Sequence, residues 1–244
     1  PDEFISSLVT RHSSLPFDMA FLCNPNNPTG RLLKKNDVFE IAEAAKKLKC
    51  LLIVDEAFID FHPEESVIKD VQNNPYLIVL RSMTKFYALT GLRIGYGVFS
   101  RSLIEELKKL KEPWTVNSLG QKAAVAALED KSYVEKTFKV IRREKIFLEN
   151  SFKETGIKSY PSDANFYLLQ MPPLAKGGKG DFETNMIIQS LRKKGILVRN
   201  CSNFKGLDNS YIRVAVKSHK NNMRLIKELS RLLSSPDNPG GLNV

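Results

Sequence analysis

Side chains that could bind an anionic aromatic molecule, and react with its carbonyl group, follow three successive apolar runs of the chain. They are Asn27 after the first run, Asp55 after the second, and Ser82, Thr84, Lys85 and Arg93 after the third. A lysine amine can form an imine, hydroxyls and a guanidinium group can bind a phosphate, and a carboxylate can pair with a ring nitrogen. Together these residue types predict a site for an anionic aromatic cofactor that is held through an imine.

The apolar runs themselves are typical of buried strands. They cover residues 18–23, 51–54, 76–80 and 94–99, and a helical spacing of apolar residues covers 37–49. Strands that are apolar along their whole length and alternate with helices favour an α/β fold, with a mostly parallel sheet covered on both faces. Ligands of such sheets bind at the carboxyl ends of the strands, and the polar clusters of this sequence stand there.

After about residue 113 the pattern changes to that of an α+β unit. It predicts a helical region over 119–153, a strand at 166–170, a helix over 182–194, strands at 196–199 and 211–216, and a terminal helix over 222–233. We therefore expect residues 1–114 to be part of a large cofactor-binding domain and residues 115–234 to form a smaller C-terminal domain. Residues 172–180 are expected to be an exposed loop, and 235–244 a tail.

The net charge of +10 comes entirely from the second half of the chain. Residues 1–112 hold 15 basic and 15 acidic side chains, whereas residues 113–244 hold 22 basic and 12 acidic ones. The basic residues lie along amphipathic helices, as at Lys136, Lys139, Arg142, Arg143 and Lys145. They indicate a solvated basic face or, as the alternative, a surface that attracts small anionic substrates. Because no aromatic residues are interleaved with them, no nucleic-acid partner is expected.

Other features exclude several classes of protein. The chain has 244 residues, of which 42% are apolar and 26% charged, figures typical of globular proteins and not of collagen-like or disordered chains. It has no apolar stretch long enough to cross a bilayer and no visible secretory signal, so no membrane partner is expected. Three cysteines without paired spacing indicate reduced thiols and a cytoplasmic location. His12, His62 and His219 lack metal-ligand spacing, so we expect surface histidines and no metal site.

Two other motifs in the sequence lack the context that their families require. Ser82 and Lys85 form the Ser-x-x-Lys pattern of penicillin-binding enzymes, but the sequence has no Lys-Thr-Gly partner. The glycines at 91, 95 and 97 do not form a dinucleotide fingerprint, because they precede and occupy a predicted strand instead of following one.

Four segments in order and spacing identify a family. They are 24–30 (Asn-Pro-Asn-Asn-Pro-Thr-Gly), 54–57 (Val-Asp-Glu-Ala), 82–85 (Ser-Met-Thr-Lys) and 91–95 (Gly-Leu-Arg-Ile-Gly). The chain resembles the fold-type I pyridoxal-phosphate enzymes, which are the class I/II aminotransferases and their relatives. The resemblance implies that pyridoxal 5'-phosphate is held by Lys85 through an imine. It also implies that Asp55 pairs with the ring nitrogen, that Asn27 bonds the ring hydroxyl oxygen, and that Ser82, Thr84 and Arg93 bind the phosphate.

One departure from the family pattern bears on the reaction. Most aminotransferases of the family have a tyrosine three residues after the aspartate, and this sequence has Phe58 there. With the second-half segments 112–117, 195–208 and 211–215, this resembles a branch of the family that decarboxylates phosphorylated amino acids. The alternatives left open are a histidinol-phosphate or related aminotransferase and, in another class, an inactive fragment with a binding role.

The resemblance also suggests how a substrate would be bound. Arg213 matches the arginine that binds the α-carboxylate, and Arg199 matches the one that contacts a substrate phosphate, which suits a small anionic phosphorylated amino acid. Asn165 and Asn117 are expected near that substrate. The usual N-terminal third of the family pattern is missing, including a glycine-containing turn that binds the cofactor phosphate. The complete protein is expected to be a homodimer.

Overall fold

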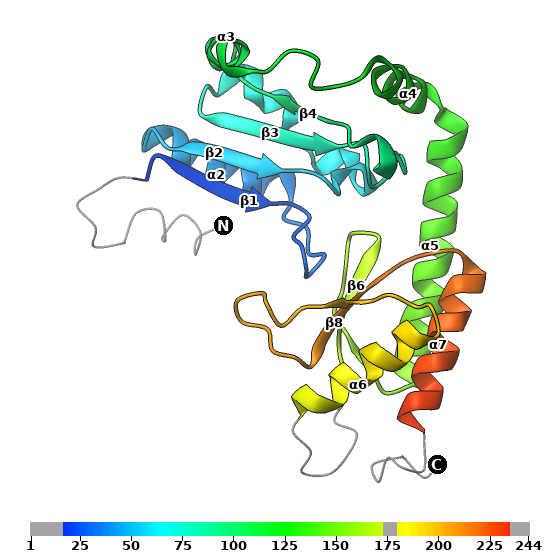
Figure 1. Cartoon of the computed structure of the whole chain (residues 1–244). Coiled ribbons are helices and arrows are strands. Elements are labelled where there is room, and N and C mark those ends of the chain that lie inside the picture. Colours follow the sequence, from blue (N-terminus) through cyan, green and yellow to red (C-terminus); the bar gives the residue numbers. More distant parts are fainter. Residues whose placement is uncertain (1–16, 173–179, 235–244) are drawn as a thin grey trace. The chain divides into compact units, whose positions relative to one another are not determined.

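The computed structural model describes residues 17–172 and 180–234 of the chain. The predictions of a loop at 172–180 and a tail at 235–244 therefore lie almost wholly outside the described residues. Contacts divide the chain into two compact units. Unit 1 comprises Pro1–Asn27 and Arg31–Val134, and unit 2 comprises Pro28–Gly30 and Glu135–Val244. Each unit contains one sheet among its described residues (Figure 1).

The sheet of unit 1 has the strand order β1-β2-β3-β4. Its strands are β1 (Met19–Cys23), β2 (Leu51–Asp55), β3 (Leu77–Ser82) and β4 (Gly95–Val98). The first three are parallel, and β4 is antiparallel to β3. The predicted mostly parallel sheet is confirmed, with strand ends displaced by one or two residues from the predicted ones.

One face of this sheet packs against helix α2 (Lys35–Lys47). Successive side chains of a strand point to opposite faces, so Leu52 and Val54 of β2 share one face. They meet Ile41 of the helix in a buried cluster. Burial of this apolar stripe stabilises the layer at roughly 25 cal/mol per Å² removed from water. The helix ends before Lys49, whose φ of 54° is left-handed.

The structure of unit 1 also contains elements that were not predicted. They are helix α3 (Arg101–Leu110) and the short 3₁₀ helices η1 (Ile59–Phe61), η2 (Pro63–Glu65), η3 (Ile68–Asn73) and η4 (Thr90–Leu92). The prediction of one helical region over 119–153 was wrong at one residue. Asp130 separates α4 (Ser118–Glu129) from α5 (Lys131–Glu154), because its backbone, with a ψ of 79°, is not helical. Its side chain accepts a hydrogen bond from the backbone N–H of Tyr133 at 2.9 Å, at the start of α5.

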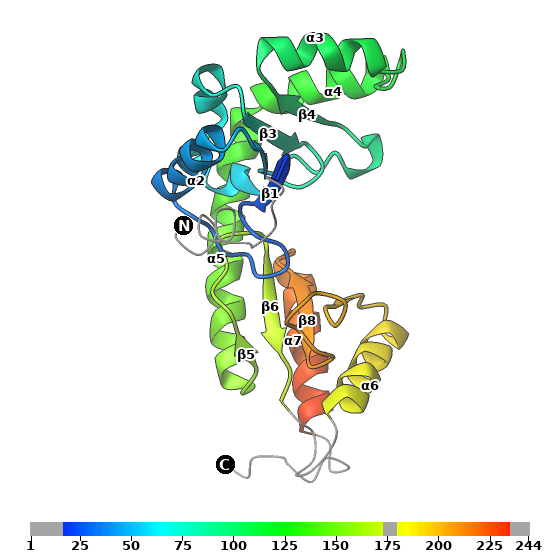
Figure 2. The same cartoon turned by 90° about the vertical axis from the view of Figure 1, so that its left-hand side faces the viewer.

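Unit 2 is an α+β unit with an antiparallel sheet in the order β5-β6-β8-β7. Its elements are the greater part of α5, from Glu135 on, and β5 (Lys158–Ser159), β6 (Phe166–Gln170), α6 (Gly180–Lys193), β7 (Arg199–Asn200), β8 (Tyr211–Ala215) and α7 (His219–Leu233). Helices α6 and α7 run side by side (Figures 1 and 2). One core cluster joins the sheet to the helices through residues such as Phe152, Leu191, Ile212 and Leu225.

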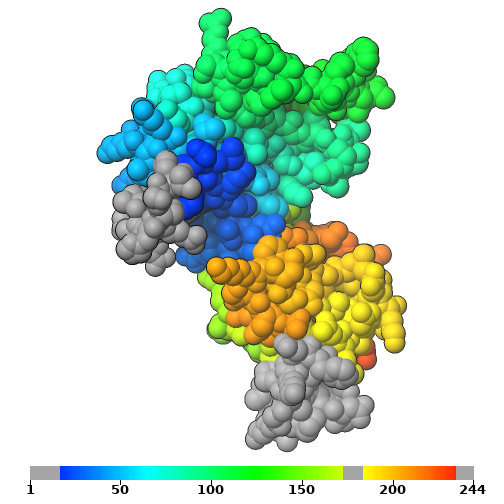
Figure 3. Space-filling view, turned by 60° about the vertical axis from the view of Figure 1, so that its left-hand side comes forward, coloured from blue at the N-terminus to red at the C-terminus, as the bar shows by residue number. Residues whose placement is uncertain are grey.

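Two predicted boundaries in unit 2 were wrong. The strand predicted at 196–199 is shorter and lies later, as β7, because in the described structure Arg199 and Asn200 pair with β8. Ile196 and Val198 pack against the core but do not belong to the strand. The terminal helix begins at His219, three residues before its predicted start, with Ser218 at the N-cap position. The segment between β7 and β8 forms part of the surface of unit 2 (Figure 3).

Among the described residues, no helix combines the length and the apolar character that crossing a membrane would require.

Candidate active site

Asp55 and Ser82 stand on one face of the unit 1 sheet, at the carboxyl ends of neighbouring strands. Asp55 is paired in register with Leu80, and Ser82 lies two residues further along β3. Because side chains alternate between faces, Asp55, Leu80 and Ser82 point to the same side. The sheet therefore brings a carboxylate and a hydroxyl together, as the sequence predicted.

The residues after β3 fold into a closed turn that carries the hydroxyls. Ser82 Oγ and Thr84 Oγ1 lie 2.7 Å apart, and the Thr84 N–H donates to Ser82 Oγ at 3.3 Å. Thr90 Oγ1 donates to the Thr84 carbonyl at 2.9 Å, and the Met83 N–H donates to the Ile94 carbonyl at 3.1 Å. Two adjacent hydroxyls on a fixed turn are suited to binding an anion such as a phosphate.

Lys85 follows this turn and is exposed. Its Nζ lies 5.7 Å from the centre of the Phe58 ring. Phe58 is itself buried, at the start of the segment that leads into η1. The aromatic residue that the sequence singled out is thus the neighbour of the lysine amine, although it has no hydroxyl to donate.

Arg93 lies in the same segment, beside the turn. Its φ of 50° is left-handed, and its Nη1 donates to the carbonyl of Thr90 at 3.3 Å. Its neighbour Ile94 accepts the hydrogen bond from Met83, so the arginine follows the hydroxyl turn closely in space. The guanidinium group is exposed and can reach an anion bound there.

Asn27 lies in the loop that follows β1. Cys23, at the end of β1, is paired in register with Asp55. Burial raises the pKa of the Cys23 thiol, while a hydrogen bond with the Asn27 backbone opposes that rise. The N–H of Asn24 donates to the Asp55 carbonyl at 3.0 Å. These contacts hold the loop at the same end of the sheet as Asp55.

Unit 2 brings the two predicted substrate arginines together. Arg199 of β7 and Arg213 of β8 are paired in register. Arg199 Nη2 donates to Asn203 Oδ1 at 2.9 Å, and the Arg213 guanidinium carbon lies 4.9 Å from the centre of the Phe166 ring. Burial lowers the pKa of Arg213, and the neighbouring Arg199 acts in the same direction. Two adjacent guanidinium groups make this part of the unit attractive to an anion.

The two predicted asparagines have different surroundings. Asn165 directly precedes β6, and its carbonyl accepts a hydrogen bond from the Val216 N–H at 2.8 Å. Asn117 uses its side chain to cap α4, because its Oδ1 accepts from the Gly120 N–H at 2.7 Å. A substrate role for either asparagine stays a prediction.

Sequence reasoning missed a buried ionic cluster behind this site, formed by Glu56, Asp60 and Arg81. The signal was present, because Glu56 and Arg81 are sequence neighbours of Asp55 and Ser82 and must point to the opposite face. Lys145 was also misread as part of the solvated basic face. Its Nζ donates to the Ser162 carbonyl, and burial lowers the pKa of its amine.

The residue types of unit 1 fit an aromatic phosphate-bearing aldehyde. The Asp55 carboxylate and the hydroxyl pair of Ser82 and Thr84 lie at the carboxyl ends of β2 and β3. Lys85 follows them and has an aromatic ring beside its amine. By contrast, no group of three or more His, Cys, Asp or Glu side chains that could hold a metal ion occurs among residues 17–172 and 180–234.

Comparison with known proteins identifies the family of the chain. The family model described as "Aminotransferase class I and II" matches residues 7–229. This chain belongs to that family. The residue types of unit 1 fit pyridoxal phosphate, which is present in the crystal structure of a related aminotransferase.

Similar members of the aminotransferase family include a decarboxylase and aminotransferases. A threonine-phosphate decarboxylase of Salmonella typhimurium is 38% identical over 220 residues, which are 89% of this chain and 58% of that protein. The crystal structure of histidinol-phosphate aminotransferase from Clostridium acetobutylicum aligns with a TM-score of 0.80 at 32% identity, over 88% of this chain and 64% of that one.

A third relative was crystallised with the cofactor. Histidinol-phosphate aminotransferase from Sinorhizobium meliloti, in complex with pyridoxal-5'-phosphate, aligns with a TM-score of 0.78 at 25% identity, over 88% of this chain and 57% of that one. The chain thus spans about 58% of the length of the curated relative from Salmonella typhimurium.

Proposed function

We propose that the chain forms the catalytic part of a pyridoxal-phosphate-dependent carboxy-lyase. The proposed reaction converts O-phospho-L-threonine to aminopropanol phosphate and CO2, a step of cobalamin biosynthesis. The observation that carries the proposal is Phe58, whose ring lies 5.7 Å from Lys85 Nζ where most aminotransferases of the family have a tyrosine. The 38% identity to a threonine-phosphate decarboxylase supports the same choice.

The residues of unit 1 have distinct tasks in this proposal. When bound, pyridoxal phosphate supplies an electron sink for the charge that develops at the substrate α-carbon. Asp55 holds the proton on the ring nitrogen, because a carboxylate at close range favours the protonated form. Ser82, Thr84 and Arg93 bind the phosphate, and Lys85 supplies the amine that links the cofactor to the protein.

The arginines of unit 2 orient the substrate. Arg213 binds the α-carboxylate and Arg199 the phosphate, so that both anionic ends are fixed. Orientation decides which bond at the α-carbon breaks. If the bond to the carboxylate is held for cleavage, CO2 leaves; if the C–H bond is held instead, Lys85 removes the proton and transamination follows.

The second candidate is a histidinol-phosphate aminotransferase, which the TM-score of 0.80 with the enzyme from Clostridium acetobutylicum favours. The same arginine pair would suit histidinol phosphate less completely, because that substrate has a phosphate but no α-carboxylate. A keto-acid acceptor is required for this reaction and not for decarboxylation.

A homodimer and a cytoplasmic location are further parts of the proposal. Three cysteines without paired spacing in the sequence support a reducing compartment. The homodimer is proposed for the complete protein, and sedimentation of that protein with its cofactor tests it, because a monomer mass would contradict it.

A product assay tests the reaction. The protein is incubated with pyridoxal phosphate and O-phospho-L-threonine, without a keto acid, and CO2 and aminopropanol phosphate are measured. We expect both products in equal amounts, and Lys85→Ala should abolish them. Turnover of histidinol phosphate with 2-oxoglutarate, together with no CO2 from O-phospho-L-threonine, would show that the protein is the aminotransferase.

A further inference from the structure

A buried ionic cluster lies on the face of the sheet opposite Asp55 and Ser82. Arg81 Nη1 donates to Asp60 Oδ1 at 2.8 Å, and Arg81 Nε lies 3.2 Å from Glu56 Oε2. The side chains of Arg81, Glu56 and Asp60 are only 9%, 1% and 14% exposed. One guanidinium group is therefore held between two carboxylates with little access to water.

Glu56 connects this cluster to several parts of unit 1. Its Oε2 accepts from Ser66 Oγ at 2.6 Å, and its Oε1 accepts from the Val67 N–H at 2.9 Å. Its own N–H donates to the Leu80 carbonyl at 2.9 Å. Glu56 thus joins the end of β2 to the end of β3 and to the segment before η3.

Asp60 connects the cluster to the neighbour of the reactive lysine. It lies in η1, two residues after Phe58, whose ring lies beside Lys85 Nζ. The hydrogen bond from Arg81 to Asp60 therefore ties the position of η1 to β3, which carries Ser82. A displacement of η1 would move the Phe58 ring relative to the lysine.

The cluster has little contact with water, and this affects the pKa values of its carboxyl groups. Burial raises the pKa of Glu56 and of Asp60, and the positive charge of Arg81 opposes the rise in both. Burial also raises the pKa of Tyr96, the register partner of Arg81. Removing one partner of such a group is costly, because it leaves a buried charge uncompensated.

We propose that Arg81, clamped between Glu56 and Asp60, is a positioning residue for the cofactor. It fixes the carboxyl ends of β2 and β3 relative to each other, so that Asp55 and Ser82 keep the separation that the cofactor requires. Through η1 it also sets Phe58 against Lys85. The inference rests on the cofactor of the proposed function, and it holds for decarboxylation and transamination alike.

The physical reason for an arginine here is its planar fork. The rigid guanidinium group donates through Nη1 to Asp60 Oδ1 at 2.8 Å while its Nε lies within ion-pair distance, 3.2 Å, of Glu56 Oε2, whereas a lysine ammonium is a single point charge. Arg81→Lys keeps the buried charge but gives up one of the two contacts. It therefore separates the positioning effect from the simple loss of a charge.

The test measures cofactor binding and stability separately in the full 244-residue chain. Pyridoxal phosphate is titrated into the unmodified chain, Arg81→Lys and Asp60→Asn, and the absorbance of the lysine-linked cofactor gives the Kd. Thermal unfolding without cofactor gives the stability of each variant. We expect the Kd to rise about tenfold or more in both variants, the order of effect of losing a supporting residue around a bound group.

Glu144→Gln is the matched control, because Glu144 is a buried carboxylate with an arginine partner in unit 2. It should lower the unfolding temperature and leave the Kd within about twofold. Asp60→Asn keeps the test decisive if Arg81→Lys does not fold, because Asp60 lies at the more exposed end of the cluster.

Two results would overturn the proposal. One is a Kd in Arg81→Lys and Asp60→Asn that changes no more than in Glu144→Gln. The other is an unmodified chain that gives no lysine-linked absorbance, since the clamp would then not prepare a site that takes the cofactor. A chain that binds cofactor normally but releases no CO2 from O-phospho-L-threonine defeats the proposed reaction and leaves the role of Arg81 intact.

Discussion

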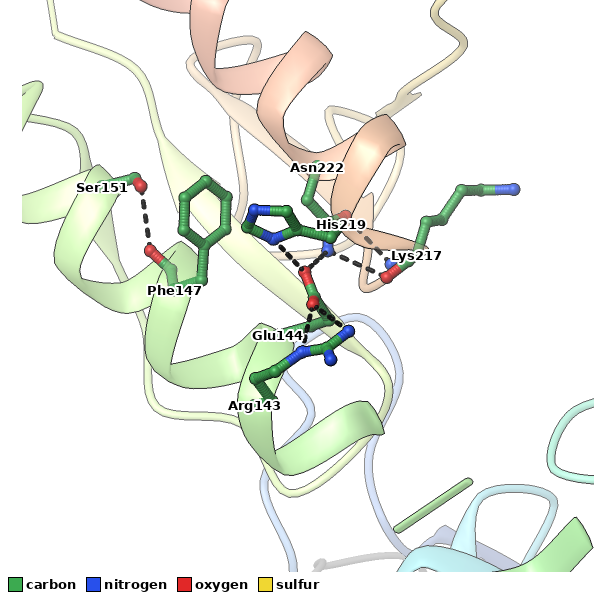
Figure 4. Close-up of polar contacts among 7 residues, drawn as sticks. All are labelled: Arg143, Glu144, Phe147, Ser151, Lys217, His219 and Asn222. Carbon is green, nitrogen blue, oxygen red and sulfur yellow. Dashed lines mark hydrogen bonds and ion pairs between the residues drawn. The ribbon is translucent and has the colours of Figure 1, made fainter. Parts of the chain in front are cut away.

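Glu144 shows how this chain stabilises a charged side chain in its interior. Its carboxylate is fully buried at the contact between α5 and α7. It accepts hydrogen bonds from Asn222 Nδ2 at 2.9 Å and from Arg143 Nε at 2.9 Å, and it lies 3.2 Å from His219 Nδ1 (Figure 4). The Phe147 and His219 rings pack in a T-shaped arrangement, with their centres 4.7 Å apart. His219, expected only at the surface, thus has a structural contact.

Glu144→Gln should make the stability of unit 2 less dependent on pH. Burial raises the pKa of Glu144, but the hydrogen bonds from Asn222, Arg143 and His219 outweigh it, and the pKa is lowered overall. A carboxylate with a lowered folded-state pKa contributes stability above its unfolded pKa of about 4.3, and loses it as the pH falls through the folded value. We expect Glu144→Gln to lower the free energy of unfolding by about 1–3 kcal/mol at neutral pH, and this difference should become smaller below about pH 4.

Urea unfolding at neutral and acidic pH, followed by circular dichroism, measures this difference. The control is Glu106→Gln, an exposed carboxylate of α3, which should change the unfolding free energy by less than about 0.5 kcal/mol. If the difference in unfolding free energy between wild type and Glu144→Gln stayed constant down to the lowest pH, it would contradict the lowered pKa of Glu144.

At the scale of elements, the approach of β4 to β3 determines the shape of the turn that carries the hydroxyls. Gly95 is paired with Ser82, and a Cβ at position 95 would lie 2.6 Å from the carbonyl oxygen of Arg81. This contact is with backbone, so it cannot be relieved by rotating a side chain. Gly91 lies in η4 of the same segment, where a Cβ would meet nothing within 4 Å.

Gly95→Ala should therefore destabilise unit 1 by about 1–3 kcal/mol, the usual cost of forcing extra atoms into a packed position. It should also weaken binding of pyridoxal phosphate, because β4 would push on the backbone between Arg81 and Ser82. Gly91→Ala is the control, and its unfolding free energy should stay within about 1 kcal/mol of wild type. Equal effects of the two alanines in urea unfolding would show that the contact at Gly95 is relieved by backbone movement.

At the scale of the whole molecule, charge is distributed unevenly. Residues 113–244 carry 22 basic and 12 acidic side chains, and Lys136, Lys139 and Arg142 of α5 are exposed. Arg199 and Arg213 lie in the same half of the chain. A field of one sign draws an oppositely charged substrate toward its site and is weakened by salt.

The KM for O-phospho-L-threonine should accordingly rise with ionic strength. Between 0.01 M and 0.1 M salt the Debye length falls from about 30 Å to about 10 Å, so that charges on the surface of α5 lose most of their influence. Replacing Lys136, Lys139 and Arg142 together by glutamine should reduce the slope of KM against salt without changing kcat. An unchanged slope in that variant would show that the attraction comes from the arginine pair alone.

The sequence by itself determined the kinds of chemistry and the order of the strands that carry them. Asp55 and Lys85 were predicted as site residues because strand ends of an α/β sheet collect polar ligands, and the local pattern of apolar runs locates the strand ends of unit 1 to within one or two residues. The strand at 166–170 was predicted at its observed bounds for the same reason. The positions of strands, and of the polar residues that follow them, depend mainly on residues that are close in the sequence.

Only the tertiary structure decided which charged residues, distant in the sequence, form ion pairs with one another. Glu56, Asp60 and Arg81 are separated in sequence, and their burial in one cluster depends on the register of β2 with β3. The internal contact of Lys145 with the Ser162 carbonyl likewise depends on a segment that is distant in the sequence. Side-chain alternation indicates which face a residue takes, but the partner that it meets there is determined by elements that the local pattern does not encode.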